Sequence, residues 1–377
     1  MFIFCYHLGM HAANRAMFRA SLSMFGAIVG AGVFALPCAF AYMGLVRGSI
    51  LFVVMALVVL EVHLFYIDIV RERKYQQMRF PSHVGSILGP TARSIAFLSH
   101  PGHIIGACLA YILLGGTFLS WLGVTLGLPL SIGLWRAIFW LGGALTVFVG
   151  MKAVFAVEQV FGWILIVSLV FLTGVYAQLP GSSLMHTSTA TSGVLGVFLF
   201  SLFGLPAISE VSDLAGRSRA AARRAVALGS IGAAILMGSF AFFAARVIGS
   251  NGTGFTPLDF IRTLPGPIQW IIPLVGLVAV STTFVLILQD LKTMLHRDAG
   301  WSSLFAWTFA LGSPAALLLF TTNFATTIGF VGSLFSALNA FFVCWMAYRT
   351  NRSRHVAPLL MVFFSGICIW RILSLFL

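Results

Sequence analysis

Long apolar stretches separated by short polar ones follow one another along the whole chain. Each stretch contains about 20 residues, the length that a helix needs to cross the hydrocarbon core of a bilayer. A transmembrane β-barrel would instead show short segments of alternating hydrophobicity. The pattern predicts an all-α polytopic membrane protein. The predicted spans are residues 18–43, 46–70, 95–122, 131–150, 154–177, 193–213, 223–248, 267–291, 303–320, 325–347 and 357–376.

Composition and charge support this prediction and add an orientation. Hydrophobic residues make up 60% of the chain and charged residues only 8%, whereas soluble domains are about 25% charged. With a cytoplasmic N-terminus, 17 of the 22 Lys and Arg residues fall in cytoplasmic segments, as the positive-inside rule requires. We therefore expect an integral protein of the cell (inner) membrane, in contact with the lipid bilayer, with its C-terminus outside. The basic residues are spread over several segments, so the net charge of +13 does not indicate nucleic-acid binding.

Two of the predicted spans carry glycine and proline near their middle. The first contains GAIVGAGVFALP (residues 26–37) and the sixth contains SLFGLPAISE (residues 201–210). The two spans are five apart, so a second block of five would enter the membrane upside down relative to the first. Interrupted helices at matching places in two halves point to a transporter with inverted repeats.

The domain organisation follows from this pairing and from the short loops. We expect a cytoplasmic N-terminal tail at 1–17 and a single transmembrane transporter domain at 18–377. Within that domain, 18–177 forms the first repeat, 193–347 the inverted second repeat and 357–376 an extra helix.

The interrupted stretches are candidate binding sites because a broken helix releases backbone N–H and C=O groups. In hydrocarbon these groups must face protein, water or a ligand, and they suit a zwitterion with a carboxylate and an ammonium. The alternative is that Gly26 and Gly30 form a GxxxG helix-packing motif. The predicted substrate-binding residues at the breaks are Gly26, Ala27, Ile28, Gly30, Ala31, Gly32, Phe203, Gly204, Leu205 and Pro206.

Five stretches, taken in order, resemble the amino acid/polyamine/organocation superfamily. They are GAIVGAGVFALP, VLEVHL (residues 59–64), LAYILLGG (109–116), SLFGLPAISE and AVSTTFVL (279–286). Within that superfamily the chain is most similar to the hydroxy and aromatic amino acid permeases of the tryptophan/tyrosine permease type, and to the amino acid/auxin permeases. Bacterial aromatic permeases often carry a Gly-Phe-His-like sequence at the sixth-helix break, where this chain has Gly204-Leu205-Pro206.

The resemblance implies a leucine-transporter-like 5+5 inverted-repeat fold with helices 1 and 6 broken. It implies that a bundle of spans 1, 2, 6 and 7 rocks against a scaffold of spans 3, 4, 8 and 9. It also implies that Tyr111 hydrogen-bonds the substrate carboxylate or closes over it, although an ordinary buried tyrosine is equally compatible with the sequence. The family's cation site, between helices 1 and 8, would here use the hydroxyls of span 8 and backbone carbonyls of span 1. Its candidate residues are Ala27, Val29, Ser281, Thr282 and Thr283.

Two alternatives stay open for the coupling ion. Hydroxyl oxygens are suitable ligands for Na⁺, but Ser and Thr commonly bond back to their own helix. Glu61 lies well inside the second span, where an acid is costly and by default a functional hypothesis, so it could carry a proton. A structural carboxyl bonded to a neighbouring helix is the other interpretation of Glu61.

Together these observations predict a secondary active amino acid transporter, coupled to H⁺ or Na⁺, that takes up neutral and possibly aromatic amino acids by alternating access. An enzyme is not expected, because no catalytic motif such as HExxH or GxSxG occurs. A channel would need rings of carbonyls or charges around a pore. No cofactor or metal site is predicted from the spacing of the cysteines, and the oligomeric state is open.

Overall fold

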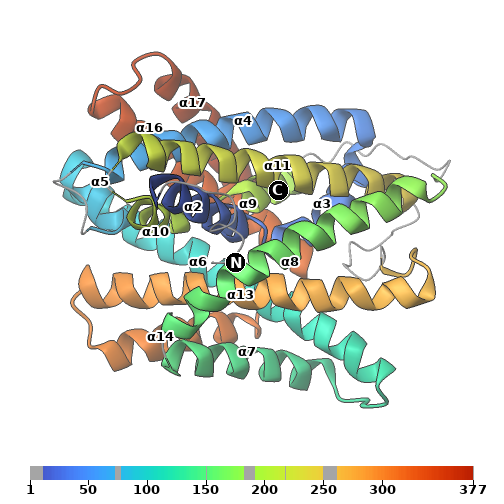
Figure 1. Ribbon diagram of the computed structural model, residues 1–377. Coiled ribbons are helices and arrows are strands. Elements are labelled where there is room, and N and C mark those ends of the chain that lie inside the picture. The colour runs from blue at the N-terminus through green and yellow to red at the C-terminus, as the bar shows by residue number, and fades with distance from the viewer. Residues whose placement is uncertain are drawn as a thin grey trace.

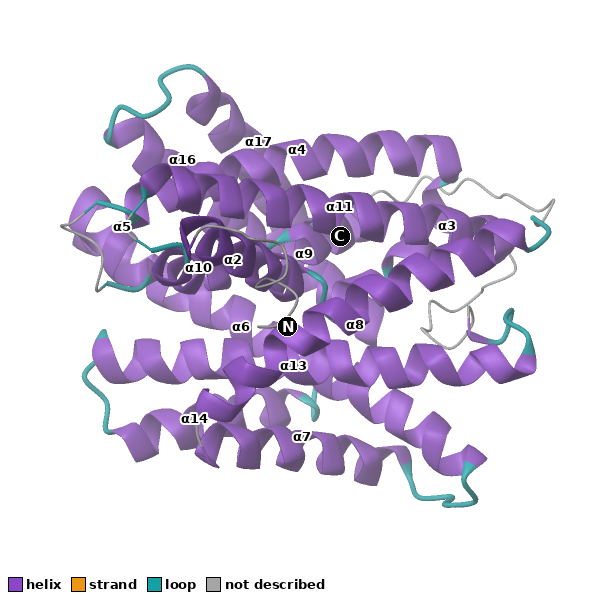
Figure 2. Ribbon diagram, viewed as in Figure 1, coloured by secondary structure: helices purple, strands orange, loops and turns teal. Residues whose placement is uncertain are grey.

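The computed structural model describes residues 12–72, 78–149, 151–181, 192–216, 218–248 and 261–376. Every element assigned in these ranges is helical, and the described connections between them are short (Figure 2). Most long helices run side by side from one end of the molecule to the other (Figure 1). This is the arrangement expected of a polytopic membrane protein, because a helix satisfies all its backbone groups internally.

The eleven predicted spans are confirmed within the described ranges, with ends that differ by a few residues. They are α2–η1–α3 (Ala12–Ile28, Ala31–Phe34, Leu36–Met43), α4 (Leu45–Val70), α6 (Pro90–Thr125), α7 (Ile132–Val149), α8 (Met151–Gln178), α9–η2–α10 (Ser192–Leu202, Leu205–Ala207, Ile208–Leu214), α11 (Arg219–Ile248), α13 (Ile271–Arg297) preceded by η3 (Gly266–Trp270), α14 (Ser303–Leu317), α15–η4–α16 (Phe324–Phe330, Val331–Ser336, Ala337–Arg349) and α17 (Val356–Leu373). Helix α2 starts six residues before the predicted span, so the predicted tail at 1–17 overlaps it. Residues 1–11 lie outside the described part of the chain.

The outward faces of these helices are apolar. Leu57 of α4, Val167 of α8, Ile235 of α11 and Val362 of α17 are each more than half exposed. Monomeric soluble proteins rarely expose apolar surface so widely. In a bilayer these side chains contact lipid, so the described helices belong to an integral membrane protein.

One helix was not predicted. The connection between the second and third spans contains α5 (Phe80–Leu88). Pro81 sits in its first turn, where the missing N–H costs nothing. Gly89 ends it with a φ of +100°, a conformation that glycine adopts without strain. The helix packs beside the start of α6 and carries His83, whose Nδ1 lies 2.9 Å from the hydroxyl of Tyr66 on α4.

An aromatic cluster holds the first, second and sixth spans together. Phe40 of α3, Phe52 of α4 and Phe198 of α9 contact one another with ring centroids 5.4–5.5 Å apart. All three side chains are buried. Tilted and edge-on aromatic pairs add about 0.5–1.5 kcal/mol each beyond the area they bury. The cluster packs α3 of the first span and α9 of the sixth span against α4. These halves of the broken spans are therefore held in place by packing that does not depend on regular backbone at the breaks.

Candidate functional site

The first span stops being a regular helix at Val29 and Gly30. The N–H of Val29 still donates to the Phe25 carbonyl at 2.9 Å, but the N–H of Gly30 donates to the Ile28 carbonyl, only two residues back, at 2.8 Å. The chain then resumes as a 3₁₀ turn at Ala31. Backbone groups in this stretch are therefore released from the helical ladder, as the glycine pattern predicted.

The sixth span breaks at Gly204, and a histidine from another helix completes its hydrogen bonding. The N–H of Gly204 donates to Nε2 of His63 on α4 at 3.1 Å. The other ring nitrogen of His63 lies 3.1 Å from Ser230 Oγ on α11. Pro206, which has no N–H, follows in η2. Our sequence analysis assigned no site role to His63, although a histidine in the middle of an apolar span is itself a signal.

The two breaks lie directly against each other. A Cβ added to Gly204 would lie 2.7 Å from Cγ1 of Ile28, and one added to Gly32 would lie 2.6 Å from Cα of Ser201. Real Cβ atoms essentially never come this close to other atoms. Glycine at these positions lets the two interrupted backbones approach, which a larger residue would prevent.

A cavity of about 350 Å³ lies between the two breaks, α6 and α13, and we call it the central cavity. Its size is at the lower end of the range for small-molecule sites. Much of its wall is aromatic or aliphatic. Its lining residues are Ser23, Ala27, Ile28, Gly30, Gly32, Arg79, His103, Ala107, Tyr111, Phe200, Phe203, Gly204, Pro206, Ala207, Glu210, Asp213, Thr283, Leu286, Ile287, Gln289, Asp290, Thr293 and Arg297.

The central cavity brings together most, but not all, of the predicted site residues. Those that line it are Ala27, Ile28, Gly30, Gly32, Tyr111, Phe203, Gly204, Pro206 and Thr283. Those outside its lining are Gly26, Val29, Ala31, Glu61, Leu205, Ser281 and Thr282. Their roles in binding or coupling stay predictions.

Tyr111 and Thr283 meet the first break from opposite helices. The Tyr111 hydroxyl lies 2.8 Å from the position of a Cβ on Gly30, and the Thr283 methyl lies 3.5 Å from it. The hydroxyls of Thr282 and Thr283 both donate to carbonyls of their own helix, at 2.9 Å to Val278 and 2.9 Å to Ala279 respectively. This is the local bonding that we gave as the alternative to a cation site.

Glu61 lies on a different face of α4 from the cavity. It is partly buried, and it interacts electrostatically with Cys344 of α16. Asn339, also on α16, accepts a hydrogen bond from Ser99 of α6 at 2.7 Å. That bond links α6 to α16.

The central cavity extends from the breaks to what we call the basic end, where α4 and α13 finish and α6 begins. Arg79 and Asp290 form an ion pair there at 3.4 Å. Glu210, Asp213 and Arg297 also line the cavity. Buried charges without partners are costly, so these charged side chains need opposite charges or water as partners along this half of the cavity.

The arginines at the start of α11 pair with an acid of the second span. Arg219 pairs with Asp68 of α4 at 3.1 Å, and Arg223 pairs with the same carboxylate. Asp68 lies in the last turns of α4, where the start of α11 passes close by. Arg217 lies outside the described residues.

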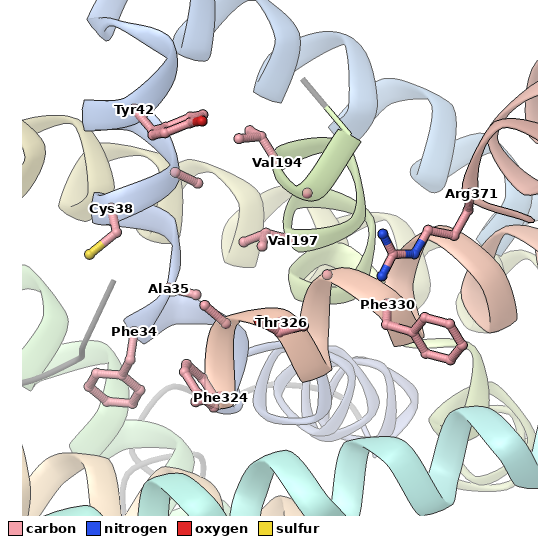
Figure 3. Close-up of a pocket in the computed structure, with 14 residues that line it drawn as sticks. Phe34, Ala35, Cys38, Tyr42, Val194, Val197, Phe324, Thr326, Phe330 and Arg371 are labelled. Atoms are coloured by element: carbon pink, nitrogen blue, oxygen red, sulfur yellow. The ribbon is translucent and has the colours of Figure 1, made fainter. Parts of the chain in front are cut away.

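A second cavity, of about 290 Å³, is lined by residues of η1, α3, α9, α15 and α17 (Figure 3). We call it the apolar cavity. Val194 and Val197 of α9 point toward Cys38 and Tyr42 of α3, and Phe324 lies below them. Arg371 of α17 is the one charged residue among those lining this cavity.

A contact between glycines lies beside the apolar cavity, which Gly329 also lines. A Cβ on Gly196 of α9 would lie 2.0 Å from the Gly329 carbonyl oxygen, and one on Gly332 would lie 1.8 Å from the Gly196 carbonyl oxygen. The backbones of the sixth and tenth spans are thus in direct contact. This glycine contact joins α9 to the π-helical segment η4, and π segments frequently occur at functional sites.

Comparison with solved structures defines the class of protein. The crystal structure of MhsT in complex with L-phenylalanine matches this chain with a TM-score of 0.67, over 93% of this chain and 98% of MhsT, at 16% sequence identity. The likeness shows the fold, a leucine-transporter-like 5+5 arrangement with helices 1 and 6 broken. The protein is a membrane transporter of this fold class, and not an enzyme.

Residues 13–253 match the Tryptophan/tyrosine permease family, and the chain belongs to that family. Comparison with curated proteins found no match. The family membership, together with the fold, supports amino acid transport.

Proposed function

We propose that this protein is a secondary active transporter that takes up a neutral amino acid with an aromatic or large apolar side chain. The described spans would form a single transport domain that works by alternating access. The observation that carries the proposal is the meeting of two helix breaks on one cavity. Released backbone N–H groups there suit a carboxylate, and released carbonyls suit an ammonium. Both ends of an amino acid are thereby recognised without a dedicated charged side chain.

The apolar wall of the central cavity supports the substrate class. Phe200, Phe203, Leu286 and Ile287 line it, and such a wall favours an apolar side chain by the area it buries. MhsT, which has the same fold, was crystallised with L-phenylalanine. We expect the Tyr111 hydroxyl to donate a hydrogen bond to the substrate carboxylate, because its oxygen lies 2.8 Å from the position that a Cβ on Gly30 would take.

The charge distribution supports an orientation. The positive-inside rule places the basic end in the cytoplasm, so the N-terminus lies there and the C-terminus outside. The central cavity then opens inward and the glycine contact closes the outside, which makes this conformation inward-facing. Rocking of spans 1, 2, 6 and 7 against spans 3, 4, 8 and 9 would open the outer side if span 6 also moved away from span 10, which would separate Gly196 from Gly332.

We infer that the coupling ion is the proton. Thr282 and Thr283 bond to their own helix, whereas the wall of the central cavity carries groups that exchange protons, His103 and Asp290 among them. Sodium is the alternative to be tested.

The experiment is uptake of labelled tryptophan, tyrosine, phenylalanine and leucine into proteoliposomes, under an imposed pH gradient and separately under a sodium gradient. We expect saturable uptake of the aromatic substrates driven by inward protons, without dependence on sodium. Uptake driven only by sodium would overturn proton coupling and return attention to Ser281, Thr282 and Thr283. Saturable uptake of none of the four would overturn the substrate class.

A further inference from the structure

Helix α6 carries two buried histidines one turn apart, neither of which the sequence analysis singled out. His100 is 2% exposed and His103 is 5% exposed. Their spacing of three places both on one face of the helix, and the two rings interact electrostatically. Ionisable side chains inside a membrane are costly and are functional candidates by default.

His103 lies at the level of the sixth-span break. Its ring contacts Phe203 edge-on with centroids 5.2 Å apart, and Phe200 at 6.1 Å. Its Nδ1 lies 2.9 Å from Ser336 Oγ, in the π segment of the tenth span. Among the described residues no group hydrogen-bonds Nε2, and the ring lines the central cavity. Nε2 is therefore the nitrogen free to take a proton from cavity water.

His100 lies one turn closer to the basic end. Its Nε2 is 3.4 Å from Oδ2 of Asp290 on α13, and its ring packs on Phe80 with centroids 5.0 Å apart. Its Nδ1 is buried and has no hydrogen-bond partner within the described structure. A buried polar atom without a partner is expensive, so this nitrogen needs an explanation. An imidazole with a carboxylate on one nitrogen and an open position on the other is arranged to relay a proton.

Asp290 completes the series at the mouth of the cavity. It lines the central cavity, and Arg79 pairs with its other carboxylate oxygen at 3.4 Å. Other titratable or charged groups near Asp290 are Tyr66, which interacts electrostatically with it, and His83, which is bonded to Tyr66. Glu210, Asp213 and Arg297 line the same end of the cavity. His103, His100 and Asp290 thus form a line of titratable groups from the helix breaks to the basic end.

We propose that His103, His100 and Asp290 carry the coupled proton of this transporter. His103 takes a proton at Nε2 and becomes a cation beside the substrate. It then gives its Nε2 proton to a bridging water, and that water donates a proton to Nδ1 of His100, which no protein group of the described structure hydrogen-bonds. His100 releases its Nε2 proton to the Asp290 carboxylate, which passes it to water at the basic end. Each transfer forms one bond to hydrogen and breaks another, and His100 regains its starting tautomer when water takes the Nδ1 proton and returns a proton to Nε2.

This proposal rests on the proton-coupled uptake proposed above, and it gives the coupling a physical origin. The cationic His103 would lie in the same cavity as the amino acid and would attract its carboxylate. Proton and substrate would then each bind more tightly in the presence of the other, because binding free energies are linked reciprocally.

The test compares two assays of labelled L-tryptophan transport in proteoliposomes: accumulation driven by a pH gradient, and counterflow exchange, which needs no net proton movement. For H100Q we expect accumulation to fall until the inside and outside concentrations are equal, while counterflow persists. For H103Q we expect the same loss of accumulation together with weaker counterflow, because His103 lines the cavity. Counterflow of the wild-type protein should depend on pH, and this dependence should disappear in H103Q. H355Q, which changes an exposed histidine at the start of α17, is the matched control and should accumulate like the wild type.

Accumulation by H103Q or H100Q at the wild-type level would overturn the proposal. If H103Q loses counterflow as well, the proposal is judged on the accumulation and counterflow of H100Q, because His100 does not line the cavity. The proton coupling of the proposed function is tested by the wild-type protein alone. If that protein exchanges tryptophan but accumulates it only with a sodium gradient, the coupling ion is sodium, and the results for the histidine variants do not change this conclusion.

Discussion

Two cavities of the described structure, the central cavity and the apolar cavity, are similar in volume and opposite in chemistry. The central cavity is lined by both helix breaks, two arginines, three carboxylates and a histidine. The apolar cavity has one arginine among mainly aliphatic and aromatic side chains. Arg371 itself lies over the Phe330 ring, at 5.2 Å, and its Nη1 is 3.4 Å from Ser374 Oγ.

The difference shows that volume does not identify the site. What distinguishes the central cavity is that two interrupted backbones open onto it and that its polar groups continue to one end of the molecule. Among the residues that line the apolar cavity, Phe34 of η1 and Ala35 belong to the first break and none belongs to the sixth-span break, and Gly329 of the glycine contact forms part of its wall. We therefore assign substrate binding to the central cavity, and the predictions below test that distinction.

The largest effect is expected where the two breaks touch. In G32A the new methyl group would meet the backbone of Ser201, which cannot move aside as a flexible side chain could. Overpacking of this kind costs about 1–3 kcal/mol, so we expect transport to fall about tenfold or more. G26A is the control, because nothing lies within 4 Å of a Cβ there. Similar uptake rates for G32A and G26A would contradict the close approach of the breaks.

The next effect concerns the glycine contact that closes the apolar-cavity side. In G332A the methyl group would meet the Gly196 carbonyl oxygen, which destabilises the closed state by about 1–3 kcal/mol. We expect a membrane-impermeant thiol reagent to label Cys38, in a chain whose other cysteines are replaced, at least about fivefold faster. G193A lines the same cavity without a clash and should label like the parent. A slower rate in G332A would show that the contact does not gate this side.

A smaller effect is expected from Tyr111. In Y111F the ring stays and only the hydroxyl beside Gly30 is lost. A hydrogen bond contributes about 0.5–1.5 kcal/mol, so the KM for the amino acid should rise about threefold to tenfold with little change in stability. Y42F removes the hydroxyl of the tyrosine in the apolar cavity and should leave KM unchanged. An unchanged KM in Y111F would assign that hydroxyl to local packing.

The smallest effect is expected at Arg371. R371Q removes the charge of the apolar cavity, and because that cavity is not the assigned site, uptake should stay within about twofold, as for most substitutions away from functional features. A large loss of uptake with normal expression would mean that the apolar cavity belongs to the transport path.

Much of the fold was predictable from the sequence, because span length and helix interruption are local properties. Gly30 and Gly204 mark the breaks directly, and the apolar runs give the spans. Helix α5 was missed because it is short and its signals, Pro81 and Gly89, also suit a loop.

The site was only partly predictable, because the face that a residue occupies depends on packing. Glu61 and His63 are two residues apart on α4, yet His63 reaches the sixth-span break and Glu61 faces the tenth span. His100 acquires its partner from α13, 190 positions away along the chain. No local pattern contains that pairing.

The most direct test of the central claim is equilibrium binding of labelled L-tryptophan to purified A107L and A39L. Each alanine is 2% exposed, Ala107 lines the central cavity and Ala39 lines the apolar cavity, so the same substitution reduces the volume of one cavity or the other. We predict that A107L loses binding while A39L, at equal thermal stability, keeps the wild-type affinity. Loss of binding in A39L with retention in A107L would place the substrate in the apolar cavity and contradict the account.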